Sequence, residues 1–250
     1  MWNDVVDLRD FYESQLGAVA RQAIRRSLRR IWPNLRGQSL LGLGYATPYL
    51  RPFRGEAERV IACMPAGQGV LHWPPDEPGA VALAYEGELP LPNYSIDRVL
   101  MVHGLESSES LRDTLHEIWR VLTGDGRLLL VVPNRRGIWA RFDRTPFGWG
   151  SPYSAAQLSR LLRANLFTPV RQMRALYVPP TRSRALLRSA AAWERLGSRW
   201  FPTFSGVVIM ECAKQPYAAS PARPTVAAPR RPVVVPFPQV ARRWPPEESA

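Results

Sequence analysis

Short, continuously apolar segments recur along this chain and alternate with longer segments whose apolar residues repeat every three or four positions. A continuous apolar run of this kind is typical of a strand buried on both faces, as in a parallel sheet covered by helices on each side. We therefore predict an α/β fold. The expected strands are 39–44, 60–64, 81–84, 97–102, 127–132, 170–178 and 206–213. The expected helices are 5–32, 108–122, one beginning at Ser154, and 182–199.

Three regions follow from this pattern and from composition. Residues 1–34 form an N-terminal amphipathic helix, 35–214 form the α/β domain, and 215–250 form a disordered tail rich in proline and arginine. The tail contains the apolar segment 231–238, which either docks in a protein partner or is an unselected low-complexity end. No apolar run reaches the roughly 18 residues needed to cross a bilayer, and the first ten residues do not resemble a secretion signal.

Charge and cysteine content narrow the functional class. The net charge is +12, with 33 basic and 21 acidic residues, and Lys214 is the only lysine. The basic residues are spread along the whole chain, so we do not expect a nucleic-acid-binding protein. Cys63 and Cys212 both fall in expected strands, which predicts buried free thiols and a cytoplasmic, reducing location. No His or Cys pair has metal-ligand spacing, so no metal site is expected.

Two segments carry a resemblance to a known family. Residues 89–99, LPLPNYSIDRV, resemble the "LPFpdnsFD-V" stretch of class I S-adenosylmethionine-dependent methyltransferases of type 11. Residues 115–128, LHEIWRVLTGDGRL, resemble the family's "E-xx-RVLkPGGrl" helix and turn. The resemblance covers about 35–213. It implies a Rossmann-like, seven-stranded, mostly parallel sheet with helices on both faces, and S-adenosylmethionine bound across the carboxyl ends of the first strands.

The resemblance also implies a glycine-rich turn after the first strand, where the backbone approaches the cofactor. Gly44 matches the first glycine of that turn and Tyr45 follows it. Ala46 stands at the second glycine, Pro48 at the third, and Gly42 replaces an acid. The expected cofactor contacts in this turn are therefore Gly42, Gly44, Tyr45 and Ala46.

The remaining contacts implied by the family lie after the next three strands. Met64 stands where the family places an acid that grips the ribose, and a thioether cannot accept two hydroxyl bonds. Glu86 or Glu88 reads adenine, or both belong to a solvated acidic loop. His103 lines the cofactor and substrate space, where it acts as a general base or lies beside the methionine sulfur, or it satisfies a loop carbonyl. The cofactor motif is therefore degenerate.

Two further segments have open roles. Residues 139–153 are dense in aromatics and arginine, and either cover a planar or anionic substrate or pack on the sheet edge. The helix over 182–199 is a lid, a membrane-surface face, or an ordinary packed element.

Two functions remain open from the sequence. The first is a methyltransferase for a small-molecule acceptor, to which the fold evidence leans. The alternative is a catalytically inactive methyltransferase-fold protein that serves as a binding or scaffold module, a pseudoenzyme, which the losses at Gly42, Ala46, Pro48 and Met64 favour.

Overall fold

A computed structural model of the chain describes residues 4–215. The predicted tail and its partner segment 231–238 lie outside the described residues. Seven strands form one sheet in the order β3-β2-β1-β4-β5-β7-β6. The strands are β1 (Ser39–Gly44), β2 (Arg59–Pro65), β3 (Val81–Ala84), β4 (Ile96–Val102), β5 (Leu122–Pro133), β6 (Phe167–Ala175) and β7 (Val207–Lys214). The strands β1 to β5 pair in parallel, and β7 runs antiparallel to both of its neighbours.

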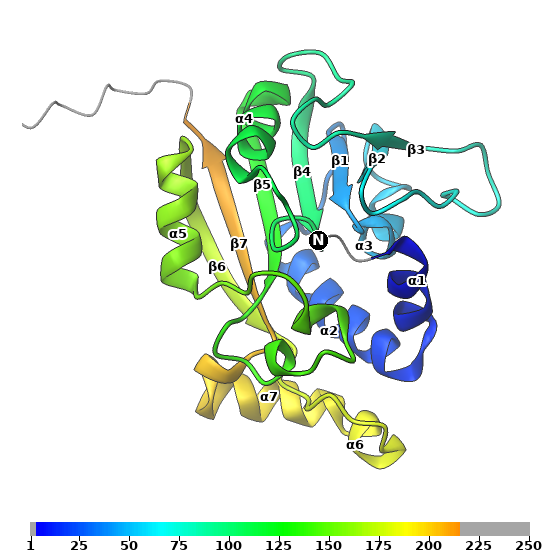
Figure 1. The fold of residues 1–250 in the computed structure, drawn as a ribbon, viewed down its shortest axis with the longest axis vertical. Coiled ribbons are helices and arrows are strands. Elements are labelled where there is room, and N and C mark those ends of the chain that lie inside the picture. The colour runs from blue at the N-terminus through cyan, green and yellow to red at the C-terminus, as the bar shows by residue number, and fades with distance from the viewer. Residues whose placement is uncertain (1–3, 216–250) are drawn as a thin grey trace, which may run out of the picture. The chain divides into compact units, whose positions relative to one another are not determined.

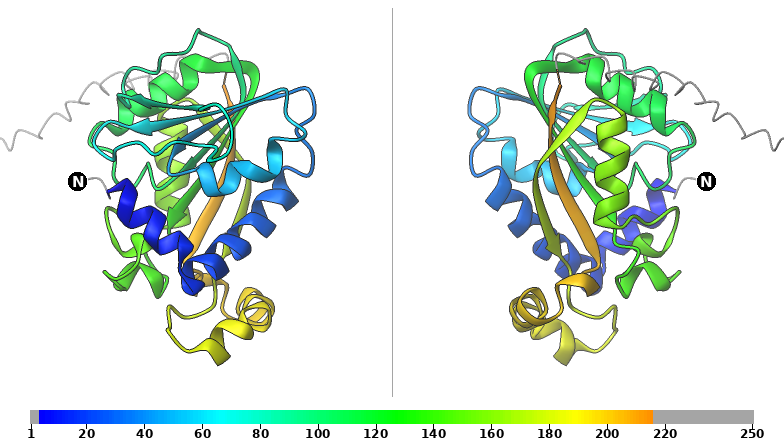
Figure 2. Two further views of the ribbon diagram at one scale, coloured as in Figure 1. Left: turned by 90° about the vertical axis from the view of Figure 1, so that its right-hand side faces the viewer. Right: turned by 90° about the vertical axis from the view of Figure 1, so that its left-hand side faces the viewer.

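Helices cover both faces of the sheet (Figures 1 and 2). They are α1 (Val5–Glu13), α2 (Gln15–Ile31), α3 (Thr47–Leu50), α4 (Leu111–Val121), α5 (Ala155–Ala164), α6 (Arg184–Arg188) and α7 (Ala190–Trp200), with short 3₁₀ turns at 51–53, 139–141, 146–148 and 202–204. One apolar core joins α1, α2 and α3 to the sheet, and the other joins α4 and α5 to its opposite face. The predicted α/β architecture is confirmed.

Both cysteines are buried and unpaired, as predicted. Burial raises the pKa of Cys63 to about 11 and, more than any other cause, that of Cys212 to about 12. Neither thiol is therefore a reactive thiolate at neutral pH. Among the described residues, no helix is long and apolar enough to cross a membrane.

The expected single helix over 5–32 is interrupted at Ser14. The Ser14 hydroxyl accepts a hydrogen bond from the Gly17 amide at 3.0 Å and so caps the start of α2. A Cβ atom on Gly17 would lie 1.9 Å from the Phe11 carbonyl oxygen, so only glycine permits this tight corner. Periodicity alone missed the break because apolar spacing continues through it.

Other boundaries also differ from the prediction. The strand expected at 127–132 begins at Leu122 and ends at Pro133, and the helix expected at 108–122 begins at Leu111. The strand expected at 170–178 begins at Phe167 and ends at Ala175, because Leu176 adopts a positive φ of 70° that a strand cannot continue through. The helix expected at 182–199 is divided at Ser189 into α6 and α7.

The motif residues that carried the family resemblance hold the sheet and its loops together. Asp97 accepts hydrogen bonds from the Ser39 amide at 2.9 Å and its hydroxyl at 2.8 Å, which ties the start of β1 to β4. The Glu117 carboxylate accepts from Arg120 at 2.7 Å and from the Leu89 amide at 2.9 Å. Arg120 also donates to the Leu89 carbonyl at 2.9 Å. These contacts are structural.

We predict that Gly17→Ala destabilises the protein by about 1–3 kcal/mol, because the added methyl group collides with backbone rather than with a flexible side chain. Thermal unfolding measures the effect. Gly55→Ala is the matched control, because a Cβ there meets nothing within 4 Å. Equal melting temperatures for the two variants would contradict the interpretation of the α1–α2 corner.

We predict a pH-dependent loss of stability at Glu117. Hydrogen bonding to Arg120, and to a lesser degree to the Leu89 amide, lowers the pKa of this carboxyl despite partial burial. Its contribution is therefore present above the unfolded pKa of about 4.3 and is lost as pH falls through the lower folded value. The melting-temperature gap between wild type and Glu117→Gln should shrink between pH 7 and pH 3. The gap for Asp125→Asn, at an exposed position, should stay near zero.

Candidate functional site

The carboxyl ends of β1, β2 and β4 meet at one edge of the sheet, because these strands are parallel neighbours. The turn after β1 begins at Gly44, whose φ is +68°, and the Tyr45 amide donates to the Val102 carbonyl at 2.8 Å. A Cβ on Gly44 would lie 2.3 Å from that same carbonyl oxygen. The glycine is therefore required by the close approach of β4. The structure brings Gly44, Tyr45, Ala46 and His103, four of the residues expected to contact the cofactor, together here.

Gly42 has a packing role. A Cβ at this position would lie 2.5 Å from Leu50 Cδ1, so α3 packs directly on the strand backbone. Pro48 stands in the first turn of α3, where its missing N–H costs no helical hydrogen bond. The residues that replaced the family's acid and third glycine therefore serve the packing of a short helix.

A buried hydrogen-bonded chain crosses this edge of the sheet. The Tyr49 hydroxyl donates to the Tyr12 oxygen at 2.8 Å, and the Tyr12 hydroxyl lies 2.7 Å from His103 Nε2. His103 Nδ1 lies 3.2 Å from Glu106 Oε1. All four side chains are buried. We call Tyr49, Tyr12, His103 and Glu106 the buried tyrosine–histidine network.

One arrangement of protons satisfies all of these bonds. If the Tyr12 hydroxyl, which accepts from Tyr49, donates to His103 Nε2, then Nδ1 carries the proton that faces Glu106. Burial, the largest cause in each case, raises the pKa of Tyr12 and of Tyr49 well above the ordinary value for tyrosine. Both hydroxyls therefore stay neutral donors at physiological pH.

The sequence predicted His103 at this site and missed its partners. Tyr12 comes from α1, which enters the site from 91 positions away in the sequence. Its ring stacks on Tyr45 with centroids 5.7 Å apart. The Gln68 side chain donates to the His103 carbonyl at 3.3 Å, and its Oε1 has no partner within residues 4–215. No local sequence signal identified Tyr12 or Gln68, because their contacts with His103 depend on long-range packing, whereas Glu106 is only three residues from His103.

The residues present do not fit S-adenosylmethionine in this arrangement. Next to Gly44 and Met64 the structure leaves a cavity of about 20 Å³, whereas small-molecule sites measure at least about 300 Å³. Met64 is fully buried and offers no carboxylate for a ribose. Glu86 accepts a hydrogen bond from the Thr114 hydroxyl at 3.1 Å, and Glu88 is exposed. Only some of the residues predicted to bind the cofactor therefore lie together at this edge of the sheet.

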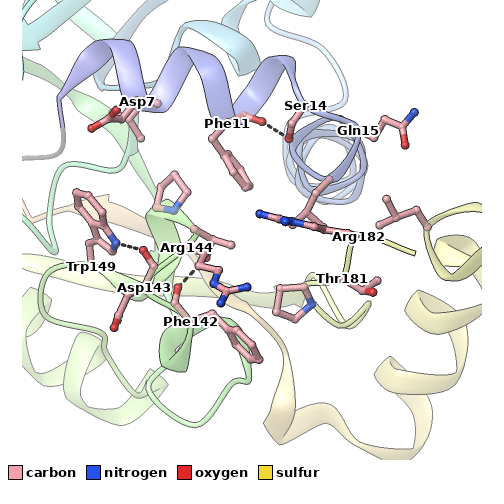
Figure 3. A pocket seen from close by; sticks show the side chains of 16 residues that line it. Asp7, Phe11, Ser14, Gln15, Phe142, Asp143, Arg144, Trp149, Thr181 and Arg182 are labelled. Carbon is pink, nitrogen blue, oxygen red and sulfur yellow. Dashed lines mark hydrogen bonds between the residues drawn. The ribbon is translucent and has the colours of Figure 1, made fainter. Parts of the chain in front are cut away.

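A much larger cavity, of about 810 Å³, opens beside this network. It lies between α1, the start of α2, the 142–149 loop and the segment 180–187 (Figure 3). Phe11 lines the cavity and also packs near the network. Its ring lies edge-on against Phe147, with centroids 6.0 Å apart, and the Phe147 centroid lies 4.9 Å from that of the His103 ring. The Phe11–Phe147 pair therefore separates the cavity from His103. The predicted aromatic and arginine loop does line a pocket.

The cavity combines apolar walls with two cationic side chains. Arg144 and Arg182 point toward its middle from opposite sides, and neither makes a hydrogen bond or ion pair within the described part of the chain. Asp7 and Asp143 also line the cavity, so it contains two carboxylates as well as two guanidinium groups. The apolar lining is Leu8, Phe11, Leu16, Phe142, Pro146, Trp149, Pro180 and Leu187. Over residues 4–215, no group of three or more His, Cys, Asp or Glu side chains is arranged to hold a metal ion.

Comparison with known proteins identifies the architecture. A family described as "Methyltransferase domain" matches residues 42–130. A methyltransferase from Thermotoga maritima superposes with a TM-score of 0.59 at 15% identity, covering 84% of this chain and 96% of its own. The 1,6-didemethyltoxoflavin-N1-methyltransferase of Burkholderia thailandensis, solved with S-adenosylhomocysteine, gives 0.52 at 17% identity, covering 84% and 85%.

A third similar structure is that of the [4+2]-cyclase SpnF, with a TM-score of 0.50 at 21% identity, covering 78% of this chain and 82% of its own. No curated protein matches the chain. At these identities the likeness establishes the fold.

We predict that Tyr12→Phe lowers stability by about 1–3 kcal/mol, because it leaves His103 Nε2 and the Tyr49 hydroxyl buried with a lost partner. For a chain of this size the melting temperature should fall by roughly 2–10 °C. Tyr45→Phe is the matched control, since the stacked Tyr45 hydroxyl makes no hydrogen bond within residues 4–215. If Tyr45→Phe lowers the melting temperature as much as Tyr12→Phe does, the buried tyrosine–histidine network does not hold α1 in place.

Proposed function

We propose that this chain, which has the fold of class I S-adenosylmethionine-dependent methyltransferases and a segment that matches their family, is a descendant of that group which binds a small anionic molecule instead of transferring a methyl group. The observation that carries the proposal is the position of Tyr12. Its ring and hydroxyl occupy the space beside the Gly44 turn, where the family resemblance expects the cofactor.

Two independent features support the loss of cofactor binding. The first is chemical: Met64 replaces the ribose-binding acid whatever the position of α1. The second is steric: α1 places Tyr12 against Tyr45, His103 and Tyr49, and the separate cavity next to Gly44 and Met64, which Tyr12 does not line, measures only about 20 Å³. Removing charge-assisted hydrogen bonds to a cofactor costs roughly ten- to hundredfold in affinity for each. The two losses reinforce each other.

The large cavity supports the type of ligand. Its volume of about 810 Å³ lies in the range of small-molecule sites. Phe11, Phe142 and Trp149 offer aromatic faces, and the guanidinium groups of Arg144 and Arg182 are available to a carboxylate or phosphate. We infer a ligand with a planar or apolar body and one anionic group.

The fold itself leaves the function open. A fold supports unrelated activities, and activity depends on the residues at the site. One of the similar structures is named as a [4+2]-cyclase rather than as a methyltransferase. Methyl transfer is therefore not required by the architecture.

A second function, methyl transfer to a small-molecule acceptor, is favoured by the position of the cavity. Phe11, which lines the cavity, packs against Phe147 and Tyr12, and both of these rings lie against His103. A displacement of α1 would remove Phe11 and Tyr12 together, and would join the two spaces. In that case the cavity would be the acceptor site. We further propose a cytoplasmic location, which the two buried free thiols support.

Isothermal titration calorimetry separates the two functions. We predict no binding of S-adenosylmethionine to the full-length protein at concentrations up to about 1 mM, which corresponds to about −4 kcal/mol. With 2-naphthoate, an aromatic carboxylate, we predict saturable binding that weakens at least about tenfold in Arg144→Ala/Arg182→Ala, because two charge-assisted contacts are removed.

The matched control is Arg160→Ala/Arg163→Ala, which removes two exposed arginines of α5 that do not line the cavity. It should bind 2-naphthoate as the wild type does. Binding of S-adenosylmethionine at micromolar concentration would overturn the proposal and establish the second function. If the two double substitutions weaken 2-naphthoate binding equally, the ligand does not bind in this cavity.

A further inference from the structure

The segment between β6 and β7 presents large apolar side chains to solvent. It contains α6, α7 and the turn at 202–204, and lies beyond the end of the sheet (Figure 1). The exposed fractions are 57% for Leu196, 68% for Trp200, 62% for Phe201 and 52% for Phe204. Large aromatic residues at this exposure, gathered in one short segment, mark an interaction surface. We call Trp193, Leu196, Trp200, Phe201 and Phe204 the aromatic ridge.

The helix α7 attaches to the rest of the protein through its small and polar residues. Glu194 accepts hydrogen bonds from the Tyr177 amide at 2.6 Å and the Leu176 amide at 3.2 Å. Gly197 packs so close to Tyr177 that a Cβ would lie 2.5 Å from it. The attached face therefore buries a carboxylate and a glycine.

The bulky face of α7 is turned away from the protein. Trp193, Leu196 and Trp200 are spaced by three and four residues, so they share one stripe of the helix. A helix of a globular protein normally buries its apolar stripe and exposes its polar one. In α7 the apolar stripe is exposed instead, which indicates that it is kept for a partner.

The charge around the ridge is of one sign. Arg184, Arg188, Arg195 and Arg199 are all exposed, and none forms an ion pair within the described residues. The only acid between positions 184 and 204 is Glu194, whose carboxylate is engaged by backbone amides. The segment therefore presents uncompensated positive charge beside aromatic side chains.

From this juxtaposition we propose that α6, α7 and the 202–204 turn bind the surface of an anionic lipid bilayer. Tryptophan and phenylalanine lie at the headgroup boundary, and the flanking arginines contact lipid phosphates. Two copies of this surface would repel each other, because both are positive. The helices lie on the bilayer, since none in the described chain is long and apolar enough to cross it. The segment also lines the cavity through Leu187 of α6, whereas no residue of the aromatic ridge lines it.

Cosedimentation of the full-length protein with vesicles tests the proposal. We expect binding to mixed phosphatidylglycerol–phosphatidylcholine vesicles and at least about tenfold weaker partitioning into pure phosphatidylcholine. Trp200→Ser/Phe201→Ser and, separately, Arg195→Glu/Arg199→Glu should each lower partitioning into the anionic vesicles by at least about tenfold.

Two matched controls keep the result specific. Leu83→Ser/Val170→Ser removes exposed apolar residues of the sheet, which are 50% and 54% exposed, and should leave vesicle binding unchanged. Arg21→Glu/Arg25→Glu reverses charges on α2, the other basic surface, and should also leave it unchanged.

Three outcomes would overturn the proposal. The first is that wild-type protein does not sediment with anionic vesicles. The second is that the α2 variant loses binding while the α7 variants keep it. The third is that light scattering detects a dimer that Trp200→Ser/Phe201→Ser dissociates, because the ridge would then join two copies of the chain. Circular dichroism and melting curves of each variant establish that it is folded.

Discussion

The hydrogen bond between the Tyr12 hydroxyl and His103 Nε2 fixes α1 at the carboxyl edge of the sheet and so limits what can bind there. It joins the N-terminal helix to the loop after β4, and Tyr49 and Glu106 extend it on either side. Because all four groups are buried, leaving any one of them unpaired would cost more free energy than a single hydrogen bond contributes. The network therefore holds α1 over the edge where proteins of this fold bind their cofactor.

In this chain the residues that carry the resemblance to the methyltransferase family are not the residues that would bind the cofactor. Asp97, Glu117 and Arg120 are retained, and they bind strand ends and the 89–93 loop. Gly44 is retained because a side chain there would collide with the Val102 carbonyl. Met64, which stands where the family resemblance expects an acid, is instead packed in the apolar core. The motif residues that are present here thus have structural roles that do not depend on a cofactor.

Hydrophobic pattern predicted most of the architecture. The strand at 39–44 was located to the residue because both faces of this central parallel strand are buried, which leaves a short run that is mostly apolar. The edge strand at 81–84 was also located to the residue, although Leu83 is half exposed. Ser154 was identified as a helix cap, and it forms a capping box with Gln157. The errors fall where apolar spacing runs through a break without changing. Examples are the corner at Ser14 and Gly17 and the division at Ser189.

The sequence by itself determined the α/β class, the fold type carried by the motif segments and the weakness of the cofactor motif, because these depend on local composition and spacing. The tertiary structure alone decided that Tyr12 fills the space beside Gly44 and that the cavity between Arg144 and Arg182 exists. It also decided that α7 turns its aromatic stripe outward, since periodicity marks an apolar face without saying which side of the helix meets the protein. Each of these features joins residues that are distant in the chain, and no local pattern contains that information.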